Sequence, residues 1–163
     1  MFLPDGKSKI LYTYSSTVIT INLTLTMERV DQDYRLFILE GPFIGKYYAV
    51  LGEDDEELTL LSFGKGLYYG KINEENIKNP LFRINKKSIT ENEMKIQNRY
   101  ILSCYEKNTH LQLLNSYYDN CMLFNLIYEN GRYIIYIKEG LGILLIRNIK
   151  NGRMVEEIFV KEA

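Results

Sequence analysis

The chain contains no tryptophan, one histidine, two cysteines and three prolines. A structural zinc site needs about four nitrogen or sulfur ligands at close spacing, which this composition does not supply. Histidine-dependent catalysis has one candidate, His110, which lies beside Asn108 and Thr109 in a stretch expected to form a solvated turn. The sequence also lacks a P-loop, a GxGxxG fingerprint and a GxSxG elbow. It therefore predicts a protein that is not an enzyme, with no catalytic residue, no cofactor and no metal site.

Long apolar runs and a strong charge of either sign are missing as well. No run approaches the roughly 18 apolar residues that cross a bilayer, and MFLPDGKSK lacks the pattern of a secretory signal. The formal net charge of -1 gives no general attraction to nucleic acid or to an anionic membrane. Cys104 and Cys121 are expected to be reduced thiols, although a bridge between them is geometrically conceivable. We expect a soluble, cytoplasmic protein that binds neither nucleic acid nor membrane.

The chain has enough hydrophobic residues to form one core. It has 163 residues, of which 46% are hydrophobic and 25% charged, and this is typical of a single soluble domain covering residues 1–163. Its 14 tyrosines suit half-buried positions on a sheet, where the ring is covered and the hydroxyl is wet. An AT-rich genome would enrich tyrosine equally.

Short apolar runs separated by polar turns predict an all-β fold of about twelve strands. The alternation is clearest in 18–27, where isoleucine and leucine share one face and threonine and asparagine the other. Residues 98–137 look like four successive strands, with Asn130-Gly131 as a hairpin turn; Asn151-Gly152 forms another further on. The remaining expected strands are 9–14, 34–39, 46–51, 58–63, a minor one in 67–72, 81–84, 94–96 (or one helical turn), 143–148 and 154–160.

Five successive acidic residues, Glu53 to Glu57, are expected to form a solvated hairpin tip because they repel one another. Such a tip is a poor place to hold a general acid, and it lacks the alternating spacing of a calcium loop. Two carboxylates brought together from distant strands stay open as an alternative.

A recurring pattern runs through the chain. A basic residue precedes Tyr47, Tyr100 and Tyr133, and a leucine follows each tyrosine after eleven residues, at Leu58, Leu111 and Leu144. Strands with an aliphatic-Phe step accompany them, at Phe37, Phe82, Phe124 and Phe159. This pattern resembles the β-trefoil proteins of the fibroblast-growth-factor, interleukin-1 and fascin-like branch, best over 46–61 and 98–160. The resemblance implies a capped barrel with pseudo-threefold symmetry.

The alternative architecture is a closed up-and-down, calycin-like β-barrel with a small apolar ligand inside. Without tryptophan the chain cannot be a ricin-type trefoil lectin, which carries a Gln-x-Trp motif in each unit. Only Lys86-Lys87 and scattered single charges are available for a heparin site of the growth-factor kind.

The function predicted first is a non-enzymatic binding module that recognises a protein partner through its loops, with a glycan as the alternative partner. Tyrosine is favoured at such interfaces. The candidate recognition residues are Tyr68, Tyr69, Tyr117, Tyr118 and Asp119. After the barrel with an apolar ligand, an enzyme of an unrecognised class is the third alternative.

Overall fold

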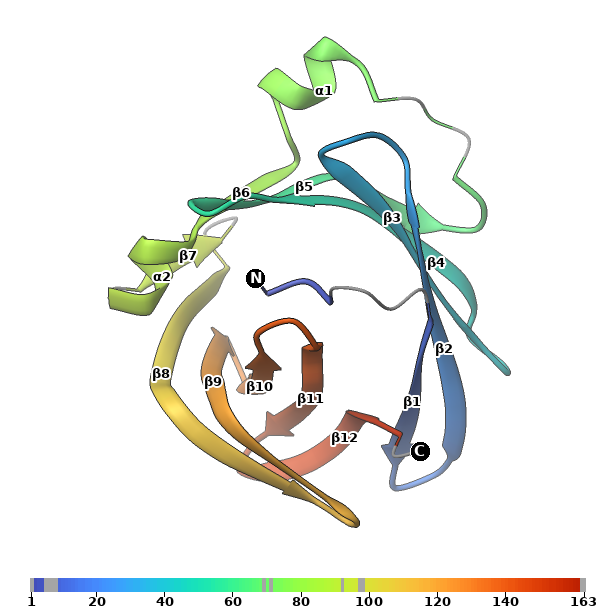
Figure 1. Ribbon diagram of the computed structural model, residues 1–163. Helices are drawn as coiled ribbons and strands as arrows, with labels where there is room; N and C mark the ends of the chain where they lie inside the picture. Colours follow the sequence, from blue (N-terminus) through green and yellow to red (C-terminus); the bar gives the residue numbers. More distant parts are fainter. Residues whose placement is uncertain are drawn as a thin grey trace.

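The computed structural model describes residues 2–4, 9–68, 70, 72–91, 93–96 and 99–161. Within these residues twelve antiparallel strands form one sheet, which curls around the N-terminal residues (Figure 1). The strands are β1 (Lys9–Ser16), β2 (Thr20–Arg29), β3 (Tyr34–Gly41), β4 (Gly45–Glu53), β5 (Glu57–Lys65), β6 (Phe82–Asn85), β7 (Met94–Ile96), β8 (Tyr100–Leu113), β9 (Ser116–Tyr128), β10 (Gly131–Lys138), β11 (Gly142–Lys150) and β12 (Arg153–Val160). Two short helices, α1 (Glu74–Lys78) and α2 (Lys86–Glu91), flank β6.

The sheet is an up-and-down meander with one exception. Its order is β6-β5-β4-β3-β2-β1-β12-β11-β10-β9-β8-β7. Every pairing therefore joins strands that are consecutive in sequence, except that of β1 with β12, and the consecutive strands β6 and β7 form the two ends of the order. There Tyr12 lies opposite Val160, and this pairing joins the two ends of the described chain in the middle of the sheet. The open edges are β6 and β7. The meander order is that of the barrel alternative, but among the described residues no strand pairing joins β6 to β7 to close the sheet.

The predicted all-β class and the number of strands are confirmed, with local differences. Residues 98–137 hold three strands where four were expected, because β8 and β9 are 14 and 13 residues long. Asn151 and Gly152 have the positive φ values, 52° and 76°, that a type I′ turn requires. The expected minor strand in 67–72 does not form at Leu67 and Tyr68, and two of its residues lie outside the described part.

The concave face of the sheet carries the main core. Alternate residues of neighbouring strands point inward, as the period of two in the sequence predicts. One inward cluster lies over β1, β2 and β3, and a second lies over β6, α2, β8 and β9. Their fully buried members are Ile10, Tyr12, Ile21, Leu23, Met27 and Phe37 in the first and Ile84, Ile89, Leu102 and Phe124 in the second.

Helix α2 covers the gap between the two open edges. Asn85 precedes the helix and its side-chain oxygen accepts a hydrogen bond from the Ser88 N–H at 2.9 Å. Ile89 is only 2% exposed and packs with Ile84 of β6 and Leu102 of β8. We call the gap between β6 and β7 the seam. Side chains packed on α2 join the two edges of the seam, where strand pairing does not.

The convex face is covered in two places. Leu36, Val50 and Leu61 form a small cluster under Tyr68 and Ile72, which lie in the connection between β5 and α1. The end of the long β8–β9 hairpin contributes a second cover, in which Leu111 and Cys121 pack with Leu145. Three register irregularities between Cys104 and Leu111 interrupt the regular pairing of this hairpin.

The β-trefoil prediction is wrong. A trefoil needs three equivalent units, whereas this sheet is a single meander. The eleven-residue recurrence does not mark equivalent positions: Leu58 and Leu144 lie in the strand after their tyrosine, but Leu111 lies in the same strand as Tyr100. The phenylalanines do not share one core either, since Phe37, Phe124 and Phe159 belong to three different clusters. Aromatic and leucine residues recur because every hairpin needs them.

Candidate functional site

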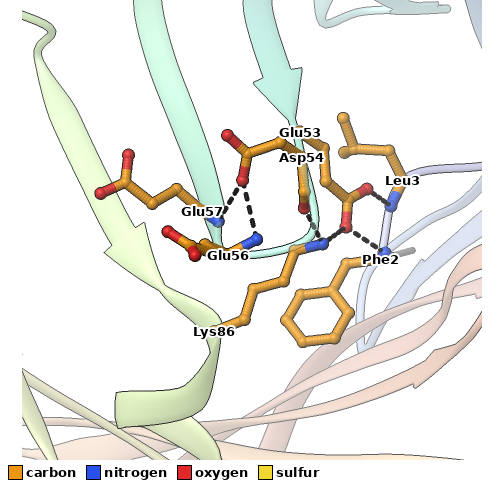
Figure 2. A network of polar contacts seen from close by, with 7 residues as sticks. All are labelled: Phe2, Leu3, Glu53, Asp54, Glu56, Glu57 and Lys86. Atoms are coloured by element: carbon orange, nitrogen blue, oxygen red, sulfur yellow. Dashed lines mark hydrogen bonds and ion pairs between the residues drawn. The ribbon is translucent and has the colours of Figure 1, made fainter.

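The most unusual group in the interior is the carboxylate of Glu53. Its side chain is 2% exposed, and its Oε2 lies 2.6 Å from Nζ of Lys86 (Figure 2). The backbone N–H groups of Phe2 and Leu3 donate to Oε2 and Oε1 at 2.6 and 2.8 Å. Burying an unpaired carboxylate is very costly, so these donors are what allow Glu53 to lie inside.

The position of Glu53 follows from the alternation of β4. Leu51 points toward the concave cluster, and Glu53 is two residues further along the same strand, so it shares that face. The chain then turns at Asp54, whose Oδ1 accepts from the N–H groups of Glu56 and Glu57 at 2.8 and 2.6 Å. These backbone hydrogen bonds lower the pKa of Asp54. The turn therefore fixes the end of β4 and the direction of Glu53.

Lys86 reaches Glu53 from the end of β6, where Asn85 lies opposite Glu57 at the start of β5. It is the first residue of α2, and its backbone N–H donates to the Glu56 carbonyl at 2.9 Å, which ties the helix to the β4–β5 turn. Its Nζ also donates to the Asp54 carbonyl and lies 5.4 Å from the centroid of the Phe2 ring. Lys86 thus contacts the carboxylate, the turn and the aromatic ring with one ammonium group.

Residues 2–4, which we call the arm, occupy the interior without belonging to any strand. The Phe2 ring meets Phe124 edge-on, with centroids 5.8 Å apart and planes at 66°. Leu3 packs against the cluster that contains Leu23 and Phe37. The arm therefore packs two half-buried apolar side chains against two different clusters of the concave face.

The third arm residue is held by its carbonyl and by a glycine. Nη1 of Arg35 donates to the Pro4 carbonyl at 2.6 Å. A Cβ on Gly142 would lie 2.8 Å from Pro4, and Gly142 has a φ of 82°, so both space and backbone require glycine there. A cavity of about 80 Å³ lies beside Leu3, lined by Arg29, Gln32, Asp33, Arg35, Leu51 and Glu53.

A second polar network lies toward the other end of β1. Tyr128 donates to Asn148 at 2.5 Å, and Asn148 donates to Oε1 of Glu156 at 3.1 Å. Tyr14 donates to Oε2 of the same carboxylate at 2.7 Å, and this hydrogen bond raises the pKa of Tyr14. These groups satisfy one another, so the network links β1, β9, β11 and β12.

The arrangement around Glu53 suits binding. Its carboxylate is committed to an ammonium group and two N–H groups. Among the residues that the structure describes, no group of three or more His, Cys, Asp or Glu lies close enough to hold a metal ion. The site offers two side chains, Glu53 and Arg35, that hydrogen-bond to a peptide backbone between two apolar clusters.

The candidate recognition residues fall into two separate places. Tyr68 is half-buried on the convex face, with its ring 5.4 Å from that of Tyr48, and Tyr69 lies outside the described residues. Tyr117, Tyr118 and Asp119 lie together on β9. Of these, Tyr117 is 60% exposed, Tyr118 is half-buried, and Asp119 pairs with Lys138 at 3.0 Å. The four described residues lie in two different parts of the fold.

The long hairpin holds the single histidine and both cysteines. His110 lies within β8 where a turn was expected, and its ring stacks on Tyr117 at 5.5 Å. Cys104 and Cys121 are both free thiols, as expected. Burial raises the pKa of each.

An apolar groove on the convex face adjoins the tip of this hairpin. It has a volume of about 610 Å³ and lies between Leu113 and Leu114 on one side and Leu145, Phe159 and Thr13 on the other. Leu114 is 92% exposed. Register confirms that Thr13, Phe159 and Leu145 share one face of the sheet, because they are directly opposite one another on β1, β12 and β11.

Sequence reasoning missed Glu53, Lys86 and the arm. Glu53 was assigned to a solvated tip with its four acidic neighbours, and it is the one that turns inward. The alternation of β4 was the available signal, since an acidic residue two positions after Leu51 belongs to the inward face. No local pattern connects Phe2 with residue 53 or residue 86.

No protein-family model matches the chain, and no curated protein matches it in sequence. Its fold is similar to solved structures. One is a Bacteroides fragilis protein described as exported and as having a YmcC-like fold, with a TM-score of 0.54 and 9% identity over 98% of this chain and 96% of that one. Another is a Parabacteroides distasonis protein described as a lipoprotein, with a TM-score of 0.53 and 9% identity over 99% and 97% of the two chains.

The complex of MucA and MucB from Pseudomonas aeruginosa is less similar, with a TM-score of 0.47 and 11% identity over 93% of this chain and 49% of that one. Among the described residues no helix is long and apolar enough to cross a membrane.

These comparisons correct two expectations. One of the two more similar structures is described as having a YmcC-like fold and neither is described as a β-trefoil, in agreement with the meander order of the sheet. The expected cytoplasmic location is contradicted by neighbours described as an exported protein and a lipoprotein, and it is withdrawn. Location could not be inferred from strand patterns, because strands of this kind fold equally well in either compartment. At 9% identity the likeness shows a common fold.

Proposed function

We propose that the protein is a non-catalytic binding module that takes an elongated apolar group of a partner into the interior of its curled sheet. The observation that carries this proposal is the arm: Phe2 and Leu3 already lie in the interior as a guest would, in contact with Phe124 and with the Leu23 cluster. The arm makes no strand pairing, so its removal leaves every ladder of the sheet intact.

The interior suits such a guest because its walls are apolar and largely built before the guest arrives. Concave, mostly apolar sites with a few polar groups are the usual form of a binding site. Here the polar groups are Glu53, Lys86 and Arg35, all of which contact the arm. The cavity beside Leu3 lies among two of these groups.

The test removes the two apolar side chains of the arm by the double substitution Phe2→Ser/Leu3→Ser. We expect the variant to bind one equivalent of an apolar fluorescent dye such as Nile red, whereas the unsubstituted protein does not. Unfolding in urea must remain cooperative, because a loosened core also binds dyes. The matched control is Val18→Ser/Leu114→Ser, which removes two apolar side chains that are 90% and 92% exposed. Equal dye binding by both double variants would remove the proposal.

A second candidate is recognition of a partner protein at the groove beside the β8–β9 hairpin. The specific observation is the volume of about 610 Å³ next to exposed Leu114 and the exposed Tyr117 ring. Exposed apolar surface of this kind marks interaction sites. Leu114→Asp would abolish capture of such a partner while leaving dye binding by the Phe2→Ser/Leu3→Ser variant unchanged.

A further inference from the structure

The way in which the arm is held says what kind of guest fits. Two successive N–H groups, of Phe2 and Leu3, converge on the two oxygens of one carboxylate. In a fully extended strand successive N–H groups point to opposite sides, so this arrangement requires the bend at Leu3. A bent peptide backbone supplies two such donors side by side, and an alkyl chain supplies none.

The side chains of the arm define two subsites of different shape. The first accepts an aromatic ring. The centroid of the Phe2 ring lies 5.8 Å from that of Phe124, which it meets edge-on, and 5.4 Å from Nζ of Lys86. The second accepts an aliphatic side chain, which Leu3 places against the cluster of Leu23 and Phe37. The two subsites therefore favour a peptide in which an aromatic residue is followed by an aliphatic one.

The third position is adapted to a proline. Arg35 donates to the carbonyl of Pro4, and a proline has no N–H of its own that would need a partner. The ring packs over Gly142, where a Cβ would lie 2.8 Å away. The backbone is therefore held at three points, two N–H groups on Glu53 and one carbonyl on Arg35.

We infer that the interior is a receptor site for a bent peptide segment of a partner protein, with the pattern aromatic–aliphatic–proline, and that residues 2–4 are its resident substitute. This inference rests on the proposed function and specifies its guest. Charge supports a peptide over a fatty acid: a carboxylate head would be placed against the buried carboxylate of Glu53 and could not supply the two N–H donors that Glu53 requires.

The experiment uses the full chain carrying Phe2→Ser/Leu3→Ser and the peptide acetyl-MFLPDG-amide, whose sequence is that of the arm and its flanks. Isothermal titration should show one peptide bound per chain, and the peptide should raise the unfolding temperature of the variant. The unsubstituted protein should bind at least about ten-fold more weakly, because its own arm occupies the site. The peptide with serine in place of Phe and Leu should not bind.

The sharpest control changes one atom of the peptide. Replacing the amide between Phe and Leu by an ester removes the N–H that donates to Oε1 of Glu53 and leaves both side chains in place. Losing a hydrogen bond to a buried charge should weaken binding by about ten-fold or more. This control needs no further substitution in the protein, so it cannot be confused with misfolding.

The outcomes separate the inference from the proposed function. If the variant binds Nile red or decanoate but not the peptide, or binds the ester peptide as tightly as the amide, the peptide inference is overturned and the interior still binds apolar groups. If it binds none of these, both fail. Light scattering would detect a dimer of the unsubstituted protein in which the two chains exchange their arms. Such a dimer would show that the guest comes from a second copy of this chain, and it would overturn the inference of a partner protein.

Discussion

Glu53 and Lys86 form an ion pair at 2.6 Å although they lie at the ends of their elements, Glu53 as the last residue of β4 and Lys86 as the first of α2. Their side chains are 2% and 14% exposed. The pair therefore joins the β4–β5 hairpin to the helix that covers the seam, and it does so next to the arm. Several properties of the protein depend on this contact.

Glu53→Gln should destabilise the protein by about 3–5 kcal/mol, because it leaves the Lys86 ammonium buried without its counter-charge. Adding Lys86→Met should recover part of that loss. Urea unfolding of the two single variants and the double variant measures the coupling. Glu40→Gln is the matched control, since the pair of Glu40 with Lys46 is longer, 3.6 Å, and exposed, so its loss should cost about 0–1 kcal/mol. If Glu53→Gln lowers the free energy of unfolding no more than Glu40→Gln does, the role given to Glu53 is contradicted.

Gly142→Ala should cost more than Gly140→Ala. Both glycines have positive φ, 82° and 79°, so each substitution carries backbone strain of about 1–3 kcal/mol. A Cβ at Gly140 meets nothing within 4 Å, whereas one at Gly142 meets Pro4 at 2.8 Å. The difference in unfolding free energy between the two variants reports the contact with the arm, and it should disappear in a Pro4→Gly background. Its persistence there would show that the arm does not pack on Gly142.

Ile89→Ala should destabilise by about 2–5 kcal/mol, because Ile89 is buried between β6 and β8 and its loss leaves a cavity at the seam. Ile77→Ala in α1 is the control: Ile77 is 40% exposed, and its loss should cost within about 0.5 kcal/mol. Hydrogen exchange should accelerate first at β6 and β7 in the Ile89 variant. Faster exchange spread evenly over all strands would argue against a local role at the seam.

Stability should fall at high pH because of Tyr12. Burial raises the pKa of Tyr12 to about 12 from an ordinary value of 10, and its hydroxyl donates to the Ile143 carbonyl at 2.8 Å. The folded state therefore favours the neutral phenol, so the stability is fully present below pH 10 and is lost as pH rises through about 12. A shift of this size corresponds to about 3 kcal/mol.

Tyr12→Phe should flatten this alkaline loss relative to the unsubstituted protein, while Tyr117→Phe, at a 60% exposed position, should leave it unchanged. Urea unfolding at pH 9, 10 and 11 compares the three proteins. An identical pH dependence in all of them would exclude Tyr12 as its source.

The sequence was sufficient for the strands and insufficient for their assembly. The alternation in β2 predicted its two faces correctly, because a half-buried strand imposes a period of two on its own residues. The pairing of β1 with β12 left no local pattern, since any two apolar strands can pair. Tyr47, Tyr100 and Tyr133 resemble a repeat because similar strands and turns need similar residues.

The site was harder to predict than the fold. Glu53 belongs to an acidic run that is typical of solvent-exposed turns, and only its inward register distinguishes it from Asp54. Lys86 is brought to Glu53 by the pairing of β5 with β6, in which Asn85 lies opposite Glu57, and the arm reaches it from the first residues of the chain. Neither approach is marked by a local sequence pattern. Tyr117 and Tyr118 were identified as surface residues from their loop context, yet only Tyr117 is exposed.

The pairing of β1 with β12 also bears on how the protein could be divided. Strands β1 to β6 form one run of local hairpins and β7 to β12 another, and the single long-range ladder between the runs is β1 with β12. Two polypeptides separated between α2 and β7 would each retain all of their local hairpins and would meet through that ladder and the α2 packing. Such halves should reassemble when mixed, which makes this sheet a candidate scaffold for fragment complementation.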